Sequence, residues 1–186
     1  MTVLFAATAG VLSAQNGSSA FVPKYAGGGQ LQLPSDYREW VFLSSGLGMT
    51  YNRPGTPGMR MEPAFTNVFV NPAAYRAFVS TGKWPDKTML VLEIRASTSK
   101  GSINQGGSYQ SEVLAIESEV KDSAKFPGSG WAFFAFGKST SGKLLPHTED
   151  CYACHAEHGA VDNTFVQFYP VLLDIAKQKG TLAAQH

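Results

Sequence analysis

The chain has 186 residues, of which 44% are hydrophobic, and this is enough to build one compact domain with a sizeable core. Its net charge is only +1, and its lysines and arginines are scattered rather than clustered, unlike those of nucleic-acid-binding proteins. No uncharged apolar run reaches the roughly eighteen residues that a membrane-spanning helix needs. We therefore expect a small molecule as partner, with no nucleic acid and no membrane.

The first residues differ in composition from the rest of the chain. Val3 to Leu12 is small and apolar, and Leu12-Ser13-Ala14 resembles a small-residue cleavage site. We interpret residues 1–14 as the remnant of a secretory signal, which makes the protein an exported one. Since the basic segment that normally opens such a signal is missing, the alternative is a merely apolar N-terminal segment.

Glycine and proline divide the next part of the chain. Residues 15–32 are predicted to form a flexible lead-in, and residues 33–180 a single domain. Ser35 is an N-cap candidate for a short amphipathic helix that ends near Gly46. A strand-like run and a helix that Gly82 stops are then predicted at Phe65–Val70 and Ala73–Thr81.

Three β-rich runs with hairpin-like links follow: Thr88–Ala96, Tyr109–Lys121 and Trp131–Gly137. Successive strands joined in this way favour an antiparallel sheet over parallel βαβ units. Asp162 to Lys177 has apolar residues near helical spacing, and Pro170 requires one helix to end and another to begin there. The expected fold class is α+β, predominantly antiparallel β-sheet with short flanking helices, including a helix near the C-terminus that carries the motif described next.

The most specific motif is Cys151-Tyr152-Ala153-Cys154-His155, which holds both cysteines of the chain. This spacing is typical of covalent haem c attachment, in which each thiol joins one vinyl group and the histidine binds the iron. We therefore predict one haem c, held by Cys151, Cys154 and His155. A thioredoxin-like pair would need a βαβ setting, and a zinc site would have to recruit His147 or His158, so both are weaker alternatives.

The residue on the other side of the iron decides whether such a protein carries electrons or binds ligands. All five methionines lie upstream of the motif, His158 is too close to His155 to reach around the haem, and His186 is at the chain end. We expect an open distal site. The alternative is an electron carrier with Met61 or Met89 as sixth ligand, although a thioether on an apolar strand is more often ordinary core.

Several segments between about Leu33 and Leu173 share a pattern with one known family. With the haem motif, they are Leu33-Pro34-Ser35-Asp36-Tyr37-Arg38-Glu39-Trp40, Val70-Asn71-Pro72-Ala73-Ala74-Tyr75, Gly82-Lys83-Trp84-Pro85-Asp86-Lys87-Thr88, Glu117-Ser118-Glu119-Val120-Lys121-Asp122-Ser123 and Phe165-Val166-Gln167-Phe168-Tyr169-Pro170. Together they resemble the cytochrome P-460 family, which includes the cytochromes c′-beta. The resemblance implies a mostly antiparallel β fold, a homodimer, a periplasmic location and a five-coordinate haem bound through His155.

Members of that family differ in their distal chemistry. The hydroxylamine-oxidising members cross-link a lysine to the haem, and the resemblance places Leu92 at that position, where no cross-link can form; Lys83 and Lys87 fall in the turn before it. The c′-beta members cap the iron with apolar side chains and bind nitric oxide or carbon monoxide. A site of the c′-beta kind is therefore our first expectation, with hydroxylamine oxidation to nitrous oxide, in which a partner cytochrome accepts the electrons, as the alternative and weak peroxidase activity also open.

Alternation along the predicted strands suggests which side chains share a face. Leu90, Leu92 and Ile94 lie on one face and form a plausible apolar haem wall. The resemblance aligns Glu117 with a distal carboxylate that could act as a base toward hydroxylamine or peroxide. The alternative is that Glu117 points into water, because its face would be shared with Ala115 and Glu119, a polar set. Strand phenylalanines are more often core than iron caps: Phe65, Phe69, Phe133, Phe134 and Phe136.

Overall fold

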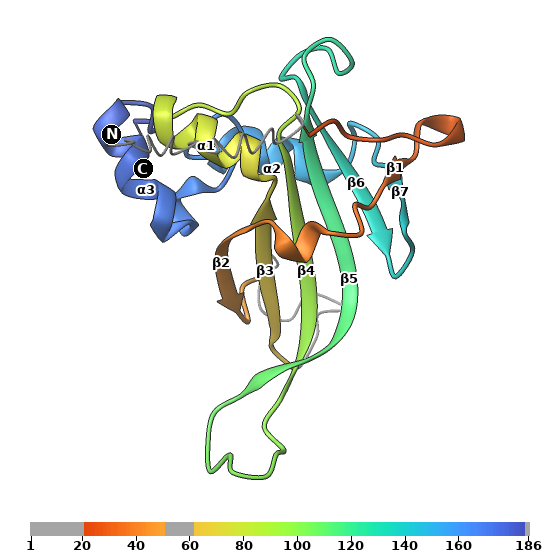
Figure 1. Cartoon of the computed structure of the whole chain (residues 1–186), viewed down its shortest axis with the longest axis vertical. Coiled ribbons are helices and arrows are strands. Elements are labelled where there is room, and N and C mark those ends of the chain that lie inside the picture. Colours follow the sequence, from red (N-terminus) through yellow and green to blue (C-terminus); the bar gives the residue numbers. More distant parts are fainter. Residues whose placement is uncertain (1–20, 51–61, 185–186) are drawn as a thin grey trace, which may run out of the picture.

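The computed structural model describes residues 21–50 and 62–184. The interpretation of residues 1–14 as a signal remnant lies outside the described residues, as does Met61. The described part of the chain forms a seven-stranded antiparallel sheet in the order β1-β7-β6-β5-β4-β3-β2 (Figure 1). None of the described helices is long and apolar enough to cross a membrane.

The described strands and helices confirm the predicted α+β class, with strand residues dominant. The strands are β1 (Leu31–Gln32), β2 (Val41–Leu47), β3 (Ala64–Val70), β4 (Met89–Thr98), β5 (Tyr109–Lys121), β6 (Trp131–Gly137) and β7 (Ser141–Leu144). The α-helices are α1 (Pro72–Thr81), α2 (Asp150–His158) and α3 (Pro170–Lys179), and the short 3-10 turns are η1 (Gly27–Gly29), η2 (Tyr37–Glu39) and η3 (Val166–Phe168). The predicted ends of β5 and β6 match the structure, and Gly82, with φ of 72°, ends α1 as expected.

The helix predicted from Ser35 to Gly46 is wrong. Only Tyr37–Glu39 forms a short 3-10 turn, and Val41–Leu47 is strand β2. β2 pairs with β3 from Val41 opposite Val70 to Leu47 opposite Phe65. Pairing with β3 along the segment, with one irregularity between Phe42 and Ser44, outweighs its short helical pattern.

Ordered structure also begins earlier than predicted, within the expected lead-in of residues 15–32. Leu31 has no exposed surface and pairs with Gly142 of β7, a strand that the sequence pattern did not reveal. A side chain at Gly142 would collide with the Phe136 ring at 2.7 Å, so this pairing requires glycine. The last residues of the lead-in are therefore part of the domain.

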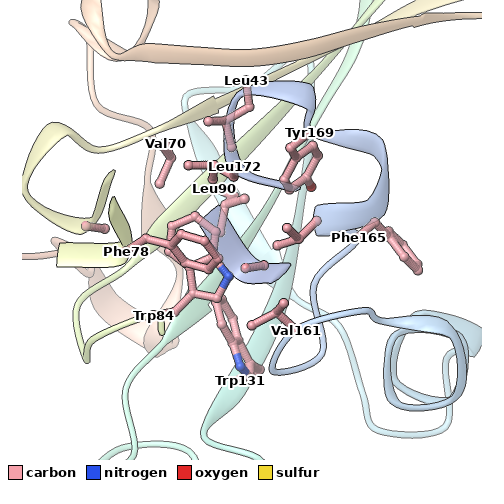
Figure 2. Packing of buried hydrophobic residues seen from close by; sticks show 13 residues of the cluster. Leu43, Val70, Phe78, Trp84, Leu90, Trp131, Val161, Phe165, Tyr169 and Leu172 are labelled. Atoms are coloured by element: carbon pink, nitrogen blue, oxygen red, sulfur yellow. The ribbon is translucent and has the colours of Figure 1, made fainter. Parts of the chain in front are cut away.

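Two apolar clusters lie on opposite faces of the sheet. The first core joins α1, α3 and η3 to one face, and Figure 2 shows Phe78, Trp84 and Trp131 close together in it. The second core fills the other face and includes Met89, Phe134 and other residues of β4 to β6. The helices gather at one end of the sheet, and the far halves of β3, β4 and β5 extend beyond them (Figure 1).

Candidate functional site

Helix α2 presents the three motif residues on one side. Cys154 and His155 follow Cys151 by three and four residues, which places all three on neighbouring turns of the same helix face. Asp150 lies in the first turn, where a negative charge interacts favourably with the helix dipole. All three motif side chains are partly buried, and Cys154 packs against the first core. The helix therefore aims both thiols and the imidazole toward the sheet.

The imidazole of His155 is held between two aromatic rings. The ring centroids of Phe133 and Phe165 lie 4.5 and 4.2 Å from its own. Its Nδ1 lies 2.7 Å from the carbonyl oxygen of Asn163, which can only accept, so Nδ1 carries the proton and donates it. This bond leaves Nε2 as the nitrogen that can bind a metal, as in histidines that ligate haem iron.

The Asn163 carbonyl belongs to a tight turn made for this contact. Asp162 and Asn163 have φ of 49° and 62°, and Val161 and Thr164 exchange backbone hydrogen bonds of 2.9 and 3.3 Å across the turn. Two consecutive left-handed residues are typical of a type I′ turn. Gly159 permits the turn to approach the end of α2 closely. A Cβ at this position would meet the His155 carbonyl oxygen at 2.5 Å and the carbonyl carbon of Asn163 at 2.7 Å.

Two further contacts anchor the turn to the body of the domain. The indole Nε1 of Trp84 donates to Thr164 Oγ1 at 2.8 Å, and Lys121 Nζ lies 2.5 Å from Asp162 Oδ2. Both partners come from segments distant in sequence. The proximal turn, residues 161–164, is therefore fixed relative to the sheet, and with it the acceptor for His155.

Asn163→Val is expected to lower the free energy of unfolding by about 1 to 2 kcal/mol, because a β-branched residue resists the left-handed conformation. Asn163→Gly keeps that conformation accessible and is expected to stay within about 0.5 kcal/mol of the parent chain. Urea unfolding of the three proteins checks this. Equal losses in both variants would show that the left-handed geometry of the turn does not matter.

A carboxylate also lies beside His155. Glu119 Oε2 is 3.2 Å from His155 Nδ1, and only 8% of the Glu119 side chain is exposed. Burial alone would lower the pKa of His155, but the charge and hydrogen-bonding capacity of Glu119 outweigh it and the pKa lies above its ordinary value. Glu119 was not a candidate site residue from the sequence. Its position two residues after Glu117, on the same strand face, was the one available signal.

Beyond α2 the sheet presents a face that is only partly covered. One row of paired residues across β3 to β6 is buried under the end of the sheet that the helices cover: Val70, Leu90, Glu119 and Phe133. The next positions toward the far end of the sheet are half-buried or exposed, and we call them the open sheet face: Thr66, Val68, Leu92, Ile94, Ala115, Glu117 and Ala135. All but Thr66 and Glu117 of these side chains are apolar, which is a surface suited to one side of a porphyrin.

Glu117 is the charged member of the open sheet face and lies directly opposite Leu92 in the β4–β5 register. Its side chain reaches solvent, yet the flanking strands still desolvate the carboxyl, and this burial raises its pKa while His155 acts in the opposite direction. Burial raises the pKa of the Cys151 thiol, and the charge of Glu117 adds to the effect. The Glu117 side chain therefore reaches solvent, and it lies on the sheet face against which α2 packs.

Other residues considered from the sequence lie away from this face. Met89 is fully buried in the second core, so it cannot serve as sixth ligand to an iron bound at His155. Lys87 forms an ion pair with Asp122. Of the five phenylalanines, Phe133 contacts His155, whereas four others alternate onto the opposite face: Phe65, Phe69, Phe134 and Phe136.

The alternatives for the two cysteines receive no support from the described residues. A redox-active pair needs a thiol with a lowered pKa, whereas burial raises the pKa of both Cys151 and Cys154. Across residues 21–50 and 62–184, no three His, Cys, Asp or Glu side chains converge as a metal site. His147 packs its ring on Tyr152, and His158 is largely exposed.

A helix bearing Cys-x-x-Cys-His, a histidine with its Nδ1 proton already engaged, and an adjoining apolar sheet face together fit a haem-binding protein. The family model for cytochrome P460 matches residues 34–166, most of the chain. The chain belongs to the cytochrome P460 family, and its cofactor is accordingly a haem. A comparison with curated proteins found no match to the chain.

Proposed function

We propose that this protein is a periplasmic, homodimeric cytochrome with one haem c and an open distal site that binds small uncharged ligands such as nitric oxide or carbon monoxide. Cys151 and Cys154 form the thioethers and His155 is the axial ligand. The observation that carries the proposal is the open sheet face, which lies next to the motif helix and is mainly apolar. When bound, the haem supplies an iron with a free coordination position.

The chain's own residues account for covalent attachment of a single haem. Its two cysteines share one face of α2, so both thiols are available to one porphyrin. The Asn163 carbonyl fixes the imidazole so that Nε2 faces away from the proximal turn.

Ligand preference follows from the side chains of the open sheet face. Val68, Leu92 and Ile94 offer no hydrogen bonds and no ligating atom, so they disfavour water and charged ligands and leave neutral diatomic molecules favoured. The family resemblance places Leu92 at the position where hydroxylamine-oxidising members carry the cross-linking lysine, and leucine cannot form that bond. This supports ligand binding rather than oxidation as the main activity.

Glu117 is the observation that favours the second candidate function. A carboxylate whose pKa is raised by burial is better matched to proton transfer near neutral pH. In hydroxylamine oxidation, two hydroxylamine molecules yield one nitrous oxide and one water, and release four protons and four electrons. Glu117 would accept protons in turn, and a partner cytochrome would accept the electrons.

The Glu117→Gln variant separates the two functions, because it removes the base and keeps the size of the side chain. We expect nitric oxide affinity within about twofold of the parent and no hydroxylamine-dependent reduction of an added cytochrome by either protein. Optical titration and steady-state assay measure these quantities. Glu112→Gln, which removes a charge from the exposed start of β5, is the control.

Parent turnover that falls at least about 100-fold in Glu117→Gln, but not in Glu112→Gln, would replace ligand binding with oxidation as the function. Failure of the parent protein to bind nitric oxide at all would overturn the proposal directly.

A further inference from the structure

Glu119 is a buried carboxylate, and one of its two oxygens has no ordinary hydrogen-bond donor. Its Oε2 accepts no hydrogen bond from the described part of the chain, and its nearest polar neighbour is His155 Nδ1 at 3.2 Å. Lys121, two residues along the same strand face, does not neutralise it, because its Nζ is directed to Asp162 and to the Trp84 carbonyl. Leu90 and Phe133 flank Glu119 in the sheet register.

A buried carboxylate in this position needs hydrogen-bond donors or an opposite charge, since one left without them is destabilising. Once Nε2 binds iron, the imidazole is neutral and has one N–H, on which two acceptors converge: the Asn163 carbonyl oxygen and Glu119 Oε2. Glu119 Oε2 is then a buried acceptor in direct contact with the iron-binding imidazole.

We propose that Glu119 is a positioning residue that acts through His155 to stabilise the ferric state and lower the reduction potential of the haem. The inference rests on the proposed role of His155 as axial ligand. A carboxylate that shares the Nδ1 proton increases the basicity of the ligand, and its buried negative charge favours the higher charge on iron. Glu117 would thus face the ligand side, and Glu119 the imidazole.

The test is Glu119→Gln in the haem-loaded protein, since glutamine keeps the shape and removes the charge. The midpoint potential is expected to rise by ~59 mV, equivalent to a tenfold change for a one-electron couple. The iron–histidine stretching band of the ferrous protein, measured by resonance Raman spectroscopy, is expected to move to lower frequency because the ligand becomes a weaker donor. Glu112→Gln controls for the loss of one charge from the same strand.

Glu119→Asp adds a second, conservative variant that keeps the charge but draws it back by one methylene. Its potential and stretching band are expected between those of the parent and Glu119→Gln, and it also serves if the glutamine variant fails to load haem. Values equal to the Glu112→Gln control in both Glu119 variants would overturn the inference. If the parent protein lacks an iron–histidine band, the proposed function has failed instead, whatever Glu119 does.

Discussion

Replacing Cys151 and Cys154 together with serine is expected to abolish covalent haem attachment completely. The two thiols lie on one face of α2 beside the open sheet face, and a serine hydroxyl does not add to a vinyl group under the same conditions. Each single replacement should leave one thioether and a weaker but detectable attachment. Intact mass under denaturing conditions measures the covalent haem in all three variants.

Tyr152→Phe is the matched control for this experiment, because Tyr152 lies between the cysteines and bonds only the protein backbone. Its hydroxyl donates to the Leu145 carbonyl at 3.1 Å and accepts from Phe133 N–H at 3.4 Å. Full haem attachment is expected in this variant. Haem that survives denaturation of the double serine variant would contradict the assignment and would point to a bond from some other side chain.

Glu93→Gln is expected to reduce the free energy of unfolding by about 2 to 3 kcal/mol. Glu93 is 2% exposed and accepts hydrogen bonds from Tyr37, Arg38 and Arg95, with Arg95 Nε at 2.5 Å. Losing the carboxylate leaves two guanidinium groups beside a neutral amide, and breaking a largely buried ion pair is costly. Arg38 is half exposed, which places the effect at the lower end of the usual range.

Glu93 should also make the free energy of unfolding depend on pH. Burial alone would raise the pKa of Glu93, but the bonds from Arg95, Tyr37 and Arg38 outweigh it and hold the pKa below its ordinary value. A lowered folded pKa gives stability that is present above the unfolded pKa and lost as pH falls through the folded value. The advantage of the parent over Glu93→Gln should therefore shrink below about pH 4.

Urea unfolding at neutral and acidic pH measures both effects. Glu112→Gln, which changes an exposed carboxylate of β5, should stay within about 0.5 kcal/mol of the parent at every pH. A Glu93→Gln variant as stable as that control would show that the Tyr37, Arg38 and Arg95 contacts contribute no net stability.

Features encoded in local sequence were predictable. Alternation placed Leu90, Leu92 and Ile94 on one face, and β-rich runs gave the bounds of β5 and β6. The Cys-x-x-Cys-His motif, five consecutive residues, predicted a haem, and the family match supports a haem cofactor. The family match over residues 34–166 agrees with the resemblance drawn from short segments.

Features that depend on partners distant in sequence were not predictable. β2 and the β1–β7 pair form because of their neighbours in the sheet, and their own residues give weak strand signals. The Asn163 carbonyl acquires its role through a turn anchored by Trp84, eighty residues earlier. Glu119 lies beside His155 only once α2 is folded onto the sheet.

The most direct test of the account is the absorption spectrum of the reduced protein, recorded before and after addition of nitric oxide. We predict a high-spin, five-coordinate ferrous haem c spectrum that shifts when nitric oxide binds, because the proposed function makes His155 the axial ligand and the open sheet face offers no histidine or methionine as a second one. A low-spin, six-coordinate spectrum that nitric oxide does not change would contradict the account. A Soret band far to the red, with haem bound beyond two thioethers, would instead show that a lysine cross-link exists and that the placement of Leu92 is wrong.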